Sequence, residues 1–172
     1  NLPHIMGFPE FSSKAMCNTL FLRGSLSNYI LDEYLFNIEK YFPNYQLETI
    51  YGAGHWIHTE RRDEFNQHVI KFFATLPNAL LELKTKSNHV EHILELPHGG
   101  KTVISWSVNP QVIIAKEELK TATLDERLKA ARMASDAGYK VAFHFDPMID
   151  YPDWEKGYQG LVEQIFDNIN PE

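Results

Sequence analysis

The sequence has almost no cysteine, because Cys17 is the single copy among 172 residues. An internal disulfide is therefore excluded, and the chain offers at most one thiolate to a metal ion or an iron-sulfur cluster. This cysteine usage fits a reducing compartment, and we expect the protein to be cytoplasmic.

Long hydrophobic runs are also missing. Residues 112–115 and 141–143 form typical apolar runs of this sequence, and both are far shorter than the roughly 20 residues that a membrane-spanning helix needs. The first twenty residues lack the basic start and apolar core of a secretory signal. We therefore expect neither a membrane span nor export.

Basic residues are outnumbered, with 16 Lys and Arg against 23 Asp and Glu and a formal net charge of -7. This charge opposes attraction to a phosphate backbone, so we do not expect autonomous nucleic-acid binding. Any such contact would need a local patch such as Lys84, Lys86 and Lys101. A small molecule is the more plausible partner, and self-association is left open.

The hydrophobic content of 44% is sufficient for a core. Short apolar or β-branched runs alternate with amphipathic runs, which is the pattern of successive βα units. The pattern predicts an α/β fold with a mainly parallel layered sheet of five strands and helices on both faces, with an arc of a barrel as the alternative. The expected strands are residues 19–23, 46–51, 80–84, 102–107 and 140–145, and the expected helices are residues 30–41, 61–74, 88–94, 124–137 and 154–168.

One composition break, at residues 74–78 around Pro77, marks a possible join between two pieces. Each piece alone would expose strand edges and an uncovered apolar face. We therefore expect a single compact domain over residues 1–172, built from pieces 1–77 and 78–172.

A glycine-rich turn carries the first chemical signal, because Gly52-Ala-Gly-His55 follows an expected strand. With the flanking Trp56 and residues 20–24, 47–58 and 64–66, it resembles the last strands and last helix of α/β-hydrolases, particularly small esterases. The resemblance covers roughly residues 1–76 and implies that His55 is a general base.

The rest of a hydrolase triad is not evident in this chain. No Gly-x-Ser-x-Gly elbow occurs in the sequence, although this family exposes its nucleophile there. Where many members carry the acid, the chain has residues 25–28, and the nearest carboxylate is Asp32. We interpret His55 as an orphan base, with Ser25 or Ser27 as the alternative nucleophile if the chain is an esterase.

Several motifs in the second piece lie at the carboxyl ends of expected strands, where α/β proteins place ligand-contacting side chains. They are Lys84-Thr-Lys-Ser87, His98-Gly-Gly-Lys-Thr102, Ser105-Trp-Ser-Val-Asn-Pro110, Phe143-His-Phe-Asp-Pro147 and Trp154-Glu-Lys-Gly-Tyr158. From spacing alone, ordinary strand and turn roles are equally good explanations. In this order, the motifs resemble the carboxyl-terminal half of spore photoproduct lyase and related radical S-adenosylmethionine enzymes, over about residues 79–172.

The resemblance implies a partial βα barrel, an iron-sulfur cluster, S-adenosylmethionine and repair of a thymine photolesion in DNA. It further implies that Lys86, Ser107 and Asp146 line the S-adenosylmethionine pocket. Three cluster cysteines cannot come from this chain, so we expect no metal site. We expect no bound cofactor, with S-adenosylmethionine as the alternative.

Three functional hypotheses follow. The first is a recombined α/β protein that keeps its fold but is catalytically silent. The second is an S-adenosylmethionine-binding remnant of a lyase-like DNA repair enzyme, and the third is an esterase that uses His55. We expect that the chain is not an enzyme; otherwise it is a lyase of the radical type or a carboxylic ester hydrolase.

Overall fold

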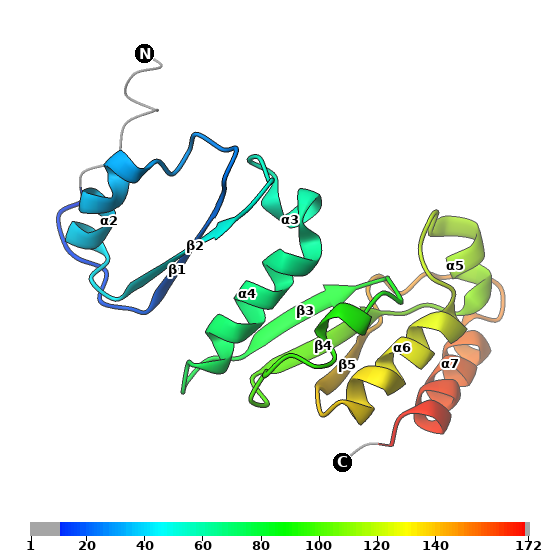
Figure 1. Ribbon diagram of the computed structural model, residues 1–172. Helices are drawn as coiled ribbons and strands as arrows, with labels where there is room; N and C mark the ends of the chain where they lie inside the picture. The colour runs from blue at the N-terminus through cyan, green and yellow to red at the C-terminus, as the bar shows by residue number, and fades with distance from the viewer. Residues whose placement is uncertain (1–10, 171–172) are drawn as a thin grey trace. The chain divides into compact units, whose positions relative to one another are not determined.

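The protein is described from a computed structural model, in which residues 11–170 are placed. The chain divides into two compact units, and the division falls between Phe72 and Phe73. Each unit has its own sheet, one with two strands and one with three. Figure 1 shows the order of the elements along the chain.

The first unit is built around two parallel strands, β1 (Thr19–Gly24) and β2 (Tyr45–Ile50). A 3-10 turn, η1 (Asp32–Tyr34), and helix α2 (Leu35–Tyr41) form the crossover between them. After β2 come the short helix α3 (Ile57–Glu60) and helix α4 (Arg62–Ala74). This is one complete βαβ unit with a helix after it.

The second unit has three parallel strands in the order β3 (Leu81–Thr85), β4 (Thr102–Ser107) and β5 (Lys140–His144). Strands β3 and β4 are joined through a 3-10 turn, η2, at Glu91–Ile93. Helices α5 (Gln111–Glu117) and α6 (Leu124–Asp136) lead to β5, and α7 (Trp154–Asn168) follows it. Neighbouring strands are therefore consecutive in the sequence, as in an arc of a βα barrel.

The α/β class and the parallel strands are confirmed, and each strand begins and ends within one residue of the expected position. The strands are divided between two sheets, however, where one sheet of five was expected. Periodicity reports which residues are extended but not which strands are neighbours. The single compact domain stays a prediction.

Two helix predictions need correction, and one helix was missed. The helix expected over residues 30–41 starts as the 3-10 turn η1 at Asp32 and is an α-helix only from Leu35. Residues 88–94 form only the three-residue turn η2, because this segment has poor helix formers such as Asn88 and His89 and soon reaches Pro97. Helix α5 was missed, since its apolar residues 112–115 are β-branched at three positions and resemble a strand. Its sequence signal is Pro110, which lies directly before the first helical residue.

Helix α6 has the ends that its sequence predicts. Thr123 accepts a hydrogen bond from the backbone of Glu126, and the Glu126 side chain accepts one from the Thr123 backbone. Gly138 takes a positive φ of 85° just after the helix, which glycine adopts without steric cost. The expected core positions Leu124 and Leu128 are buried.

The two faces of the three-stranded sheet differ in polarity. Strand register and alternation place Leu83, Ile104 and Trp106 on one face, and this apolar face packs against the helices. Ile104 and Trp106 are 1% and 0% exposed. The other face is polar, and along the three strands it carries Glu82, Lys84, Ser105, Ser107 and His144.

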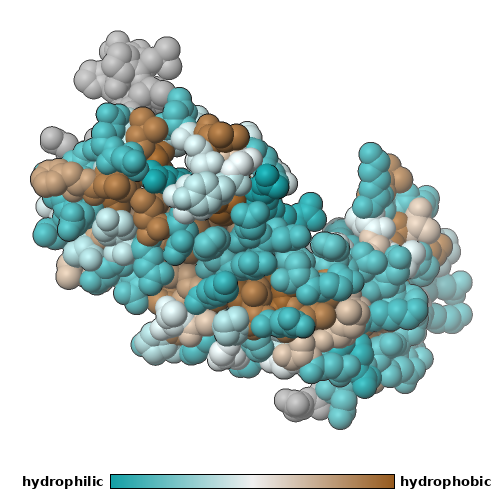
Figure 2. Space-filling model, viewed as in Figure 1, coloured by the Kyte–Doolittle hydropathy of each residue, from teal (hydrophilic) through white to brown (hydrophobic). Residues whose placement is uncertain are grey.

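Figure 2 shows a viewed face that is mostly hydrophilic, with hydrophobic side chains gathered in small patches. Several large hydrophobic side chains are exposed, among them Phe36, Tyr51, Leu119 and Phe166. Self-association stays a prediction. Within residues 11–170, no helix is both long and apolar enough to span a bilayer.

Candidate functional site at the strand ends of the second unit

The expected cofactor residues lie at the carboxyl ends of three adjacent parallel strands. Lys86 follows β3, Ser107 ends β4, and Asp146 comes two residues after β5. Ser107 is paired in register with His144, so these two side chains are neighbours on the polar face. The carboxyl edge of a parallel sheet is where α/β proteins bind ligands.

One hydrogen bond and one ion pair connect the two outer strands of the sheet on this polar face. His144 Nε2 lies 2.6 Å from Glu82 Oε1, and Lys84 Nζ donates to Asp146 Oδ2 at 2.7 Å. Both contacts join the β3 side of the sheet to the β5 side, and Ser105 of the central strand is 0% exposed. The two contacts therefore order the side chains of the polar face.

These contacts favour the charged carboxylates. Ser105 and then His144 hold the pKa of Glu82 below its usual value by favouring its charged form. The hydrogen bond from Lys84 lowers the pKa of Asp146 in the same way. Both carboxyl groups are therefore ionised at neutral pH and available to bind cationic or hydroxyl groups of a ligand.

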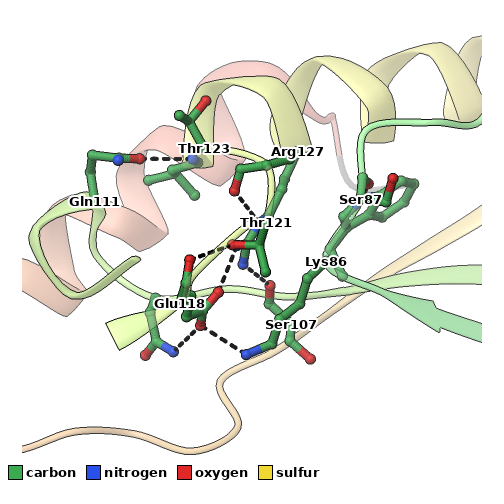
Figure 3. A network of polar contacts seen from close by, with 12 residues as sticks. Lys86, Ser87, Ser107, Gln111, Glu118, Thr121, Thr123 and Arg127 are labelled. Atoms are coloured by element: carbon green, nitrogen blue, oxygen red, sulfur yellow. Dashed lines mark hydrogen bonds and ion pairs between the residues drawn. The ribbon is translucent and has the colours of Figure 1, made fainter. Parts of the chain in front are cut away.

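A buried polar network adjoins this face and is centred on Arg127 (Figure 3). The side chain of Arg127 is 0% exposed. Its Nη1 donates to the Ser107 carbonyl at 2.8 Å, its Nε to the Ala122 carbonyl at 2.9 Å, and its Nη2 to Thr121 Oγ1 at 2.8 Å and to Glu118 at 2.6 Å. Arg127 thereby fixes the end of β4 to the start of α6.

Glu118 is the acidic centre of the same network, and its side chain is 8% exposed. Its carboxylate accepts hydrogen bonds from Lys86 Nζ at 2.9 Å and Asn109 Nδ2 at 3.2 Å, in addition to that from Arg127. Burial alone would raise the pKa of Glu118, but the bonds from Lys86, Arg127 and Asn109 outweigh burial and lower it. Glu118 is thus a buried anion paired with two cations.

Lys86 also borders a hollow of about 480 Å³. The hollow lies between the loop after β3 and the segment before α6, and its lining is polar. Ser107 and Asp146 do not line this hollow. The structure therefore connects Lys86 to Ser107 through Arg127 and Glu118, whereas Asp146 is held separately by Lys84.

Sequence reasoning missed Glu118 and Arg127. A signal for Arg127 exists, because it lies three residues after Leu124 and four before Ala131, on the buried face of α6. A charged residue at such a position requires a buried partner. No comparable pattern marks Glu118, which lies just after α5.

In the first unit, His55 lies in the turn after β2 and its side chain is exposed. Its ring stacks on Tyr29 with a centroid separation of 3.9 Å. His55 and Ser27 border the same small cavity of about 130 Å³. Asp32, the acid considered from the sequence, forms an ion pair with Arg23 at 2.7 Å. The geometry of the described residues thus gives His55 an aromatic neighbour rather than an orienting carboxylate.

We predict that His55→Ala will leave ester turnover by this chain at the wild-type level. Without an acid that fixes its tautomer, His55 lacks the support that a triad histidine receives. The measurement is hydrolysis of p-nitrophenyl acetate, with His58→Ala as the matched exposed histidine control. A loss of more than tenfold in His55→Ala alone would contradict this interpretation.

Comparison with known proteins identifies the family of this chain. The sequence model of the family described as spore photoproduct lyase matches residues 34–172. The chain belongs to the spore photoproduct lyase family. The match begins before the expected join near residue 77 and extends through the whole second unit.

The similar proteins agree with this assignment. The chain is 34% identical over 116 residues to spore photoproduct lyases of Geobacillus sp. (strain Y412MC61) and Bacillus subtilis (strain 168), covering 67% of this chain and 32% of each relative. A solved spore photoproduct lyase mutant with bound AdoMet and dinucleoside spore photoproduct matches with a TM-score of 0.62 and 29% identity, covering 72% of this chain and 36% of that one. The chain thus spans about a third of the length of these relatives.

The hydrolase resemblance is also confirmed. The chain is 38% identical over 72 residues to the sn-1-specific diacylglycerol lipase ABHD11 of Xenopus tropicalis, which covers 42% of this chain and 23% of the lipase. Two resemblances therefore occur on one polypeptide.

The family implies two groups, an iron-sulfur cluster and S-adenosylmethionine, and the residues of this chain fit only the second. An iron-sulfur cluster does not fit this chain, because the single thiol, Cys17, is in the first unit and near Thr19. S-adenosylmethionine fits the donor set of the second unit. Lys86 would offer an ammonium group for its carboxylate, Ser107 a hydroxyl, and Asp146 a carboxylate for ribose hydroxyls or the sulfonium.

Proposed function

We propose that the second unit binds S-adenosylmethionine at the carboxyl ends of β3, β4 and β5, and that this polypeptide alone is catalytically silent. The observation that carries the proposal is that Lys86, Ser107 and Asp146 lie at the carboxyl ends of three adjacent parallel strands. The solved relative with bound AdoMet supports the choice of ligand.

The charges of the site support the same ligand. S-adenosylmethionine carries an amino acid carboxylate, an amino group, a sulfonium and a ribose with two hydroxyls. Lys86 complements the carboxylate, and Asp146, whose pKa is lowered by Lys84, complements positive charge or hydroxyl donors. Both kinds of partner are thus available at one edge of the sheet.

The catalytic silence follows from what these residues can do. Binding and orientation are within the capacity of Lys86, Ser107 and Asp146, but reductive cleavage of the ligand needs an electron source. The one cysteine of the chain cannot hold a cluster that would supply the electron. Substrate repair is therefore not expected of this polypeptide alone.

The experiment is a thermal unfolding titration with S-adenosylmethionine. A ligand at ten times its Kd stabilises the folded state by about 1.4 kcal/mol. In a domain the size of the second unit, Phe73–Glu172, each kcal/mol raises the Tm by roughly 4–8 °C. We expect the shift in the wild-type chain and its loss in Ser107→Ala and Asp146→Ala. Isothermal titration at 25 °C gives the Kd independently of stability.

Two controls make the test specific. Asp136→Ala removes an exposed carboxylate that pairs with Arg132 at the end of α6, and it should keep the full shift. S-adenosylhomocysteine lacks the sulfonium charge and should bind more weakly than S-adenosylmethionine. If the wild-type chain shows no shift and no heat of binding, the proposal is wrong.

A further inference from the structure

Arg127 and Glu118 form hydrogen bonds with two of the residues that are proposed to bind S-adenosylmethionine. Arg127 Nη1 bonds the main-chain carbonyl of Ser107, and Glu118 Oε1 bonds the ammonium of Lys86. One carboxylate and one guanidinium therefore connect the ends of β3 and β4 to each other and to α6. These strand ends carry the proposed contacts.

The geometry points to Glu118 and Arg127 as positioning residues of the S-adenosylmethionine site, an inference that rests on the proposed function. A lysine side chain has several rotatable bonds, so a free Lys86 ammonium would sample many positions. The bond to Glu118 selects one position, and 36% of the Lys86 side chain remains exposed for a ligand. Pre-organisation of this kind increases affinity because less freedom is lost on binding.

The planar fork of Arg127 has a role that lysine cannot take over. Its three nitrogens donate to four acceptors, on β4, on the segment before α6 and on Glu118. A lysine at this position keeps the charge but supplies one nitrogen at one point. Arg127→Lys would therefore release the Ser107 carbonyl or the loop before α6.

The backbone supports the same link between β3 and the loop before α6. Ala122 N donates to the Lys86 carbonyl at 3.1 Å, next to the bond from Arg127 Nε to the Ala122 carbonyl. A shift of this loop would therefore move Lys86 through its main chain as well as through Glu118. Ligand affinity should depend on both members of the pair.

The test uses two variants that conserve charge, so that the attraction between protein and ligand is unchanged. Glu118→Asp withdraws the carboxylate by one methylene, and Arg127→Lys removes the fork. We expect the Kd for S-adenosylmethionine, measured by isothermal titration at 15 °C, to rise at least fivefold in Glu118→Asp and at least tenfold in Arg127→Lys.

Leu128→Ala is the matched control for a loss of stability alone. Leu128 is 2% exposed and lies beside Arg127 on α6, but its side chain is apolar. The variant Leu128→Ala should lower the Tm and leave the Kd for S-adenosylmethionine within twofold of wild type.

A second measurement follows Lys86 directly. With lysine labelled at Nζ with 15N, the NMR signal of Lys86 should move in Glu118→Asp while that of Lys84 stays in place.

The outcomes separate the two claims. If the wild-type chain does not bind S-adenosylmethionine, the proposed function fails, and this inference fails with it. If the wild-type chain binds but both charge-conserving variants bind within twofold of it, the proposed function stands and the positioning role is wrong. If Leu128→Ala raises the Kd for S-adenosylmethionine as much as the charge-conserving variants do, the positioning role is also wrong, since a loss of stability alone would then explain the effect.

Discussion

Arg127→Met should destabilise the second unit by about 3–5 kcal/mol, because it removes one partner of a buried ion pair and leaves buried acceptors without their donor. Met fills much of the volume of Arg127 but donates no hydrogen bond. Glu118 would keep its hydrogen bonds from Lys86 and Asn109 and lose the bond from Arg127, which is its shortest at 2.6 Å. The carbonyls of Ser107 and Ala122 would lose the donors that they now have.

Urea unfolding measures this loss. Trp106 reports on the second unit because it is 0% exposed there, and replacing Trp56 and Trp154 by Phe leaves it as the only indole. Arg132→Met is the control, because Arg132 is 57% exposed in its side chain and pairs with Asp136, and its loss should cost about 0.5 kcal/mol or less.

A double variant tests whether the cause is the broken ion pair between Arg127 and Glu118. In Arg127→Met with Glu118→Met, no buried anion is left, so the double variant should be less destabilised than the sum of the two single variants. A loss below 1 kcal/mol for Arg127→Met, or strictly additive effects, would show that this pair does not organise the unit.

Trp106→Ala should destabilise the second unit by about 3–5 kcal/mol, which is the usual cost of removing a large aromatic side chain from a core. The indole lies on the apolar face of the central strand, with its ring centroid 6.4 Å from that of Phe143. Its Nε1 donates to the Ser87 carbonyl at 2.9 Å, so the variant also leaves this carbonyl without its donor.

Far-ultraviolet circular dichroism during urea unfolding measures the effect of Trp106→Ala. Trp56→Ala is the control, since Trp56 is 62% exposed in the first unit and its removal should change stability by about 0.5 kcal/mol. If the two variants lose similar stability, Trp106 is not the core residue that its burial indicates.

The strands were predictable because each is a short apolar or β-branched run that ends at a turn or loop. The ends of α6 were predictable from Thr123, Glu126 and Gly138, which act through local hydrogen bonds and a local φ angle. The division into two sheets was not, because strand neighbours are set by tertiary packing rather than by local pattern.

The site was predictable only in part. The resemblance implied Lys86, Ser107 and Asp146, which lie at the carboxyl ends of three adjacent strands, and their role as ligand contacts stays a prediction. The polar contacts that hold them come from Lys84, Glu118 and Arg127, which are far from their partners in the sequence. Pairings over such distances have no periodic signature, and so the sequence alone cannot reveal them.

The most direct test of the central claim is an NMR titration of the 15N-labelled chain with S-adenosylmethionine. We expect saturable amide shifts to concentrate at residues 84–88, 105–109 and 144–148, at the carboxyl ends of the three strands, and to disappear in Asp146→Ala. Shifts absent from these segments at saturating ligand, or concentrated in residues 11–70 instead, would contradict the account.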